Sequence, residues 1–259
     1  RECWNSDNWD GMEYGMDYDF SKSFFTQWHE LAKRVPRMAL LSLGSSINSD
    51  FGNYVWNVKD VYMSYSTLHS ESVMYSKSID KCQDIADCFA IKESQKCYES
   101  MDGANNFNCA FVFASRGCAD SRFLFDCVND QNCFMSSNLR NKQFVFRNKQ
   151  LTADQYKIEM AKINFGSYKE LTVLRKEFAK LWNESLHKYA NSNKTVNSSG
   201  DNIENIKDSQ YVFESYDIEN SKFVVRQVNV KDSYDVTHAA NGQILYECMA
   251  GSVNSFSMR

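Results

Sequence analysis

The chain has 259 residues, of which 43% are hydrophobic and 14% aromatic, enough to bury a core in one large or two modest domains. The net charge of −4 argues against binding nucleic acid over a broad basic surface. The sequence contains no run of about 18 apolar residues, so we expect no transmembrane helix.

The nine cysteines indicate a reducing compartment rather than a disulfide framework. Their number is odd, no CxxC pair occurs, and the chain is longer than a typical disulfide-stapled secreted domain. We therefore expect most thiols to be reduced and buried as small hydrophobic side chains, which favours a cytoplasmic or virion location. Arg1 is not an initiator methionine, and we expect the chain to be part of a longer protein.

Residues 1–42 predict an aromatic N-terminal segment that is followed by one helix. Apolar side chains recur at helical spacing over 21–35, Ser21 is a suitable N-cap, and Pro36 ends the pattern. Cys3 has two interpretations: it is an isolated thiol, or it is the last ligand of a metal site whose other ligands lie upstream of the chain.

In residues 43–150, aromatic side chains recur about every 12 positions. Each unit alternates apolar and polar residues, as in 120–127, which is typical of a strand. A short fixed period is a signature of stacked coils, so we predict a parallel β-solenoid, right-handed by the usual crossover rule. We expect one strand and one turn per unit and two units per coil, with a one-unit coil as the narrower alternative. The repeating aromatic residues are Tyr62, Tyr75, Tyr98, Phe123, Phe134 and Phe144.

Cysteines that precede aromatic residues, as in Cys97-Tyr98 and Cys133-Phe134, should form an interior ladder of small side chains beside larger rings. The cysteines between 82 and 133 are separated by 5, 8, 11, 8, 8 and 5 residues, which does not match zinc knuckles or ribbons. Packing is therefore favoured over metal binding in this region.

The aromatic rhythm stops in residues 151–191, which predict a helical spacer. Thr152 with Gln155 and Ser167 with Glu170 are capping boxes, and the second helix is expected to reach about Tyr189. The rhythm restarts in residues 192–259, predicted to begin a second β-solenoid, with aromatics at Tyr211, Phe223, Tyr234, Tyr246 and Phe256.

Several short motifs spread over nearly the whole chain are specific only in combination. They are Glu2-Cys3-Trp4 with Trp9-Asp10; Tyr18-Asp19-Phe20-Ser21; Asn48-Ser49-Asp50; Asp120-Ser121 through Cys127; Asn132-Cys133-Phe134; Asn138 through Gln143; Gly200-Asp201-Asn202; and Lys231 through Val236. In this combination the chain resembles a family of uncharacterised cysteine-rich repeat proteins of candidate-phyla bacteria.

The resemblance implies a zinc ribbon upstream of a β-solenoid, with Cys3 at the end of the ribbon. Zinc is then expected in the longer protein, and no cofactor is expected within this segment. The family usually has cysteine where this chain has Val61, Ser64, Val73 and Ser76, which supports packing rather than metal chemistry in the repeats. The resemblance implies no established activity.

Three functions remain open from the sequence. The first is a non-catalytic structural or binding scaffold with protein partners or self-association, as part of an assembly such as a virion or surface structure. The second is a carbohydrate-active β-solenoid enzyme with acids on one face, although turn chemistry accounts for those acids. Its candidate acids are Asp120, Asp126, Asp130, Asp208 and Asp232.

The third is nucleic-acid binding. A basic-aromatic patch interleaves cations with rings, a pattern on which single strands can stack, and an upstream zinc ribbon could assist. The simpler interpretation is a solvated strand edge with core aromatics, and we favour it. The patch consists of Arg140, Lys142, Phe144, Arg147 and Lys149.

Overall fold

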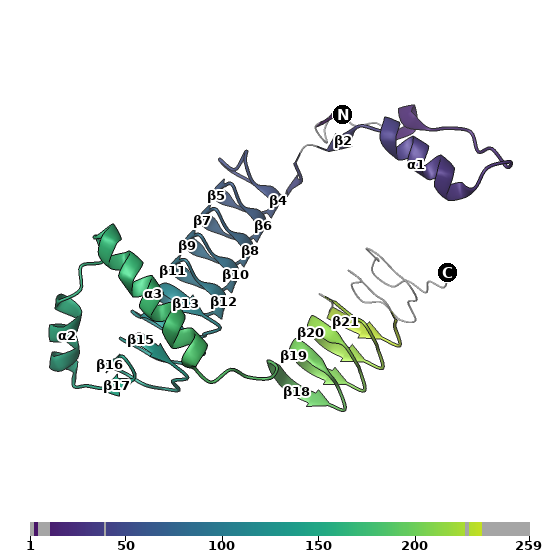
Figure 1. Ribbon diagram of the computed structural model, residues 1–259. Helices are drawn as coiled ribbons and strands as arrows, with labels where there is room; N and C mark the ends of the chain where they lie inside the picture. Colours follow the sequence, from purple (N-terminus) through teal and green to yellow (C-terminus); the bar gives the residue numbers. More distant parts are fainter. Residues whose placement is uncertain (1–2, 5–10, 39, 226–227, 235–259) are drawn as a thin grey trace. The chain divides into compact units, whose positions relative to one another are not determined.

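The structure, a computed structural model, describes residues 3–4, 11–38, 40–225 and 228–234 (Figure 1). It is mainly β, with long parallel sheets of short repeating strands, helices between the sheets in the sequence, and one N-terminal helix. The predicted class, a parallel solenoid with helices, is confirmed. The chain divides into two compact units, Arg1–Ser185 and Leu186–Arg259.

The first solenoid is a single sheet that curls through successive coils, and its strands are parallel except for the last, β17. Each residue pairs with the residue one coil later, as in Asn53 with Tyr65 and Lys59 with Glu71. Its strands are β3 (Ser42–Leu43), β4 (Asn53–Trp56), β5 (Lys59–Tyr62), β6 (Tyr65–Leu68), β7 (Glu71–Met74), β8 (Lys77–Asp80), β9 (Gln83–Ala86), β10 (Phe89–Lys92), β11 (Gln95–Tyr98), β12 (Met101–Ala104), β13 (Phe107–Phe113), β14 (Arg122–Phe125), β15 (Phe134–Ser137), β16 (Val145–Phe146) and β17 (Lys149–Gln150).

One coil contains 12 residues, so the narrower alternative is correct and the two-unit coil is wrong. Even-numbered strands from β4 to β12 pair with one another, and odd-numbered strands from β5 to β13 pair on the other face. A 12-residue unit therefore contains two strands, because a residue with positive φ recurs at nearly every third position from Asn48 to Phe144. These residues turn the chain four times per coil.

Every third side chain points into the coil, so each coil contributes four interior residues. Aliphatic residues fill much of the core, including Val55, Val61, Ile79 and Ile91. Small or aliphatic side chains occupy most of this narrow interior, and Asn106 and Asp130 are polar exceptions. The seven described cysteines take the same interior positions, in agreement with the packing interpretation, and are Cys82, Cys88, Cys97, Cys109, Cys118, Cys127 and Cys133.

Buried serines satisfy the backbone between successive coils. The Ser76 hydroxyl donates to the Met74 carbonyl at 2.7 Å and accepts the Cys88 N–H at 3.1 Å. A buried N–H without a partner is costly, so this bridge explains why polar side chains recur inside the coil. The same bridge is made by Ser49, Ser64, Ser70, Ser94, Ser100, Ser115, Ser121 and Ser136.

The aromatic rings lie outside the coil, so the expectation that they share the interior with the thiols is wrong. The interior is filled by valine, isoleucine, serine and cysteine, which leaves no room for rings. The rings nevertheless contact one another from coil to coil. Phe111 and Phe123, at equivalent positions of successive coils, stack as predicted with centroids 4.4 Å apart, whereas Tyr62 meets Tyr75 edge to face at 5.7 Å.

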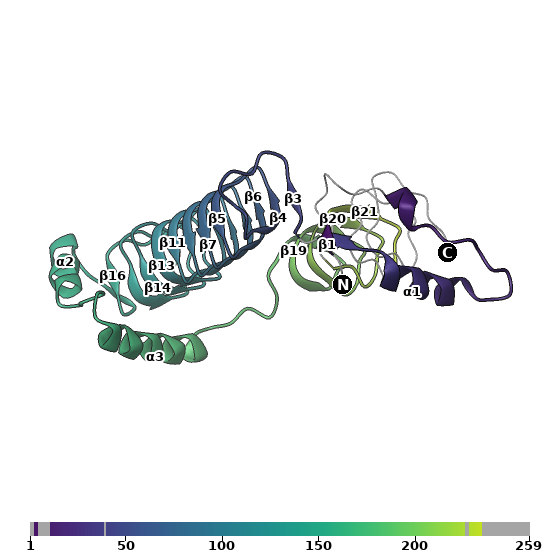
Figure 2. The same ribbon diagram turned by 90° about the horizontal axis from the view of Figure 1, so that it is seen from above.

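Helices α2 (Ala153–Ala161) and α3 (Tyr168–Glu184) pack against the outside of the last coils (Figure 2). The Thr152 capping box is formed, and Ser167 caps α3 by accepting the Glu170 N–H. α3 ends at Glu184 rather than near Tyr189, because Ser185 is already extended. β17 returns antiparallel on β16 and so ends the parallel stack.

The second solenoid consists of β18 (Ser192–Val196), β19 (Gly200–Lys207), β20 (Val212–Glu219) and β21 (Val228–Lys231), all parallel. Ile206, Ile218 and Val230 stack inside it, and the Ser209 hydroxyl accepts the Ser221 N–H as in the first solenoid. The predicted aromatics Tyr246 and Phe256 lie outside the described residues.

The N-terminal part contains β1 (Cys3–Trp4) paired with β2 (Arg37–Met38), a short 3₁₀ turn over Gly11–Tyr14 and α1 (Phe24–Arg34). Ser23, not Ser21, caps α1, and Val35 is extended before Pro36 as expected. In the described part of the chain, no helix is both long and apolar enough to cross a membrane.

Candidate functional site

The structure gives no metal site to which Cys3 could belong. Among the described residues, no three histidine, cysteine, aspartate or glutamate side chains are grouped so that they could hold a metal ion. Cys3 pairs through its backbone with Arg37, and its side chain lies outside the description. Its role as a zinc ligand with partners upstream stays a prediction.

The interior thiols are placed for packing. All seven described cysteines are buried and free, and their thiols donate to backbone carbonyls, as Cys109 Sγ does to the Cys118 carbonyl at 3.4 Å. Burial raises the pKa of Cys88, Cys109 and Cys133 to about 11. The neutral thiol is therefore the favoured form, whereas a thiolate is needed to bind a metal or act as a nucleophile.

Two cations of the basic-aromatic patch are held by acids of the chain. Arg140 binds the Asp126 carboxylate at 2.7 Å, and Arg147 binds Glu177 of α3 at 2.8 Å. Arg147 also lies 5.3 Å from the centroid of the Phe146 ring. These contacts reduce the charge that either side chain offers to a phosphate.

The other three members of the patch are not gathered into one surface. Phe144 is half-buried, with its ring centroid 6.0 Å from that of Tyr156 in α2. Lys142 and Lys149 are exposed, and the Lys142 N–H donates to Asp130. Nucleic-acid binding through these five residues stays a prediction.

Four of the candidate catalytic acids serve as ladder acceptors between coils, and one of them is Asp126, which accepts from Asn138 at 3.0 Å. Asp120 accepts from Asn108 at 2.6 Å, and Asp208 accepts from Asn197 at 2.9 Å. The interior carboxylate of Asp130 accepts the Lys142 N–H at 2.7 Å. Such contacts between equivalent positions of successive coils are what turn chemistry predicts.

The most extended surface feature is an aromatic stripe, which sequence analysis missed as a surface. It consists of eight outward rings on one side of the first solenoid, in contact from coil to coil except between Tyr75 and Tyr98. Centroid distances along it run from 4.4 Å between Phe111 and Phe123 to 5.8 Å. The stripe consists of Phe51, Tyr62, Tyr75, Tyr98, Phe111, Phe123, Phe134 and Phe146.

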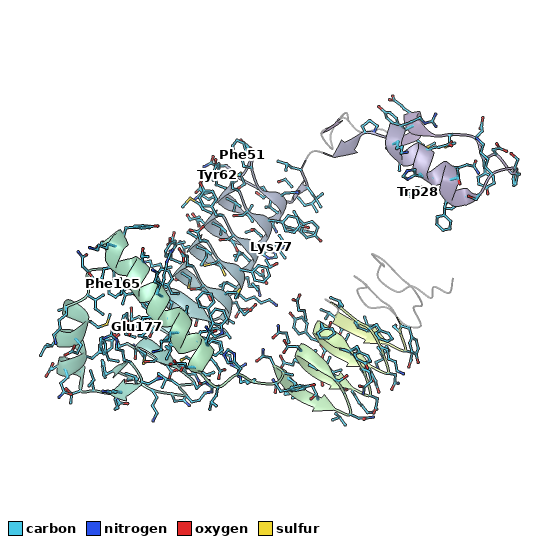
Figure 3. The ribbon with its side chains drawn as sticks, in the orientation of Figure 1. Trp28, Phe51, Tyr62, Lys77, Phe165 and Glu177 are labelled. Carbon is cyan, nitrogen blue, oxygen red and sulfur yellow. The ribbon has the colours of Figure 1, made fainter. Side chains whose placement is uncertain are left out.

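The chain's own helices cover only one half of this stripe. Leu174, Phe178 and Trp182 of α3 pack over the rings around Phe111 and Phe123, both of which are buried. In the other half Phe51, Tyr62 and Tyr75 are exposed, and the first two are labelled in Figure 3. We call these three rings, with Met63 and Met74 beside them, the open half of the stripe. Met63 and Met74 are exposed as well.

Comparison with known proteins adds no function to this geometry. No protein-family model matches the chain, and no curated protein matches it significantly. What stands of the resemblance is the parallel repeat sheet with many buried cysteines.

The sequence contains a signal for the outward position of the rings. Interior residues recur at every third position, for example Val55, Val58, Val61 and Ser64, all small or aliphatic. With an interior residue at every third position, the aromatic residues fall between interior positions and point outward. The alternation of an ordinary strand, with a period of two, would instead place them inside beside the thiols.

Proposed function

We propose that the protein is a non-catalytic structural and binding scaffold, a component of a larger assembly such as a virion or surface structure. The observation that carries this proposal is the open half of the aromatic stripe. It is an exposed apolar surface on the same side of the solenoid as the rings that α3 covers, and the coil of Asp87 separates the two. Exposed apolar patches of this kind mark protein-protein contacts.

The occupant that fits best is helix α1 of a second copy of the chain. α3 meets the covered half with Leu174, Phe178 and Trp182, which are four residues apart and form one face. α1 has the same spacing in Phe24 and Trp28, and both side chains are exposed. An amphipathic helix on an aromatic surface therefore has a precedent within the molecule.

Charge favours the same occupant. The open half ends at the next coil, where Asp87 takes the position equivalent to Tyr75. α1 carries Lys33 and Arg34 in its last turn, beyond its apolar face. Opposite charges thus lie at one end of both surfaces, which favours one orientation of the helix on the stripe.

Sedimentation velocity over about a 100-fold range of concentration tests the proposal. We expect the full chain to self-associate as its concentration rises. Trp28→Ser in α1 and Tyr62→Ser in the stripe should each shift the equilibrium toward monomer. Tyr189→Ser, which removes a fully exposed ring outside both surfaces, is the matched control and should leave association unchanged.

A chain that stays monomeric at every concentration would contradict the proposed occupant. So would association that survives both substitutions, because the contact would then lie on another surface. Circular dichroism of each variant establishes that the coil still forms, since the substituted rings lie outside the core.

A further inference from the structure

A pocket of about 480 Å³ lies between the first solenoid and α2, on a surface separate from the open half of the stripe. This volume is within the usual range of small-molecule sites. We propose that it binds a sugar acid, a pyranose ring that carries a carboxylate. One wall belongs to three successive coils, and the other belongs to α2 and to Phe165 in the loop before α3 (Figure 3).

Two cations at the pocket lack an acidic partner among the described residues. Arg122 is half-buried, and its guanidinium carbon lies 4.5 Å from the centroid of the Phe165 ring. Lys157 lies on the α2 side of the same pocket. An arginine that is fixed by ring stacking and pairs with no carboxylate in the described part of the chain is well prepared for a ligand carboxylate.

A buried hydroxyl at the pocket is also without a partner. The Tyr156 side chain is 6% exposed, and its hydroxyl makes no hydrogen bond. Burial raises the pKa of Tyr156, and Arg122 and Asp120 are among the charges that act on it. The hydroxyl therefore stays protonated, and because it is enclosed the Tyr156 ring contributes an apolar wall rather than a hydrogen bond to a ligand.

The coil wall fits the hydroxyl groups of a sugar. Asn108, Asp120 and Asn132 occupy equivalent positions of successive coils, and the Asn108 amide donates to Asp120 at 2.6 Å. An amide can donate to and accept from sugar hydroxyls, and an ionised carboxylate accepts from them. Phe144 and Phe165 supply apolar walls for the ring.

Asp120 makes a sugar acid a better ligand for this pocket than a bare anion. Its carboxylate would repel phosphate or sulfate, whereas a sugar hydroxyl can donate to it while the ligand carboxylate lies against Arg122 and Lys157. The pocket thus combines polar side chains of the coil wall, which bind the sugar hydroxyls, with two cations, Arg122 and Lys157, which bind the ligand carboxylate.

Isothermal titration of the full chain with glucuronate, glucose and inorganic phosphate tests the inference. We expect saturable binding of glucuronate, with glucose and phosphate each about 10-fold weaker or more. Arg122→Gln should weaken glucuronate binding about 10-fold, and Lys157→Gln should weaken it less. Tyr156→Phe should raise the melting temperature of the free chain, because the unpaired hydroxyl is gone, and should leave glucuronate binding unchanged, because that hydroxyl is enclosed.

Lys96→Gln removes an exposed positive charge outside the pocket and is the matched control. If Arg122→Gln does not fold, the test rests on glucuronate binding by Lys157→Gln, which should fold because Lys157 is exposed on its helix. Absence of saturable glucuronate binding would overturn the inference. Equal affinity for phosphate and glucuronate, or equal effects of Lys157→Gln and Lys96→Gln, would also overturn it.

Discussion

At the scale of single residues, the coil depends on positive φ angles in ordinary residues. Asn57, Asp60 and Asn105 adopt this left-handed region readily, because asparagine and aspartate tolerate it best after glycine. Phe123 adopts it at a φ of 58° although an aromatic residue disfavours it. Packing offsets the cost of this backbone conformation, because the Phe123 ring is fully buried under α3.

Asp130 is the interior position where the residue fits least well. One carboxylate oxygen accepts the Lys142 N–H, but the other, Oδ2, has no partner. Asn106 occupies the equivalent position two coils earlier and satisfies both ends of its amide, through Cys118 N–H and the Ser115 carbonyl. Burial raises the pKa of Asp130.

We predict that Asp130→Asn stabilises the protein at pH 7 by about 1–2 kcal/mol, because an amide can donate where the second oxygen has no partner. The pKa of Asp130 is higher in the folded state, so its neutral form favours folding and the penalty appears as pH rises through the folded pKa. Below 3.8, the ordinary pKa of aspartate, the gain should shrink.

Urea unfolding at pH 7 and at a pH below 3.8 measures this difference. Asp84→Asn is the control, since Asp84 is exposed and also has positive φ. Equal stability of Asp130→Asn and the parent chain at pH 7 would count against the argument.

At the scale of elements, α3 serves as the cover of one half of the aromatic stripe. Phe178 lies at its centre, with its ring centroid 5.5 Å from that of Phe113 and 5.6 Å from that of Phe123. Arg147 and Arg175 add ion pairs to Glu177 and Glu99, which contribute little because they are partly exposed. The helix is therefore held mainly by apolar packing.

We predict that Phe178→Ala destabilises the first unit by about 3–5 kcal/mol, the usual cost of removing a buried phenylalanine. Val173→Ala on the exposed side of α3 should change stability by less than about 0.5 kcal/mol. Unfolding followed by the fluorescence of Trp182, which contacts Phe113 and Phe125, reports on this packing. Similar effects of the two substitutions would show that α3 is not held by its apolar face.

At the scale of the whole molecule, the described chain forms two units that join after α3. Each unit has its own core and its own serine bridges between coils, as at Ser76 and Ser209. Residues 186–189, at the junction, are exposed. A connection of this kind is where proteases cleave first.

We predict that brief digestion with trypsin cuts first after Lys188. Mass spectrometry should find a fragment of residues 1–188 whose thermal unfolding, followed by circular dichroism, matches the corresponding transition of the intact chain. The Lys188→Gln chain is the control and should be cut more slowly at this junction. Earlier cleavage within the coils of 53–113 would mean that the repeats are less protected than their hydrogen bonds indicate.

The sequence by itself determined the 12-residue repeat, the parallel stacking, the buried thiols and the two capped helices of the 151–191 segment. Each depends on local or strictly periodic signals, such as the Thr152 capping box and the recurrence of Tyr62 and Tyr75. The candidate sites were harder to predict from the sequence, because a basic pattern over 140–149 does not reveal that Arg140 and Arg147 have acidic partners.

Only the tertiary structure decided how many strands a coil contains, on which side the rings lie and what covers them. A period gives the distance between equivalent residues, but the direction of a side chain depends on backbone angles that alternate every three residues. The cover over Phe111 and Phe123 comes from α3, more than 50 residues later in the chain, and that contact forms because both surfaces lose water when they meet.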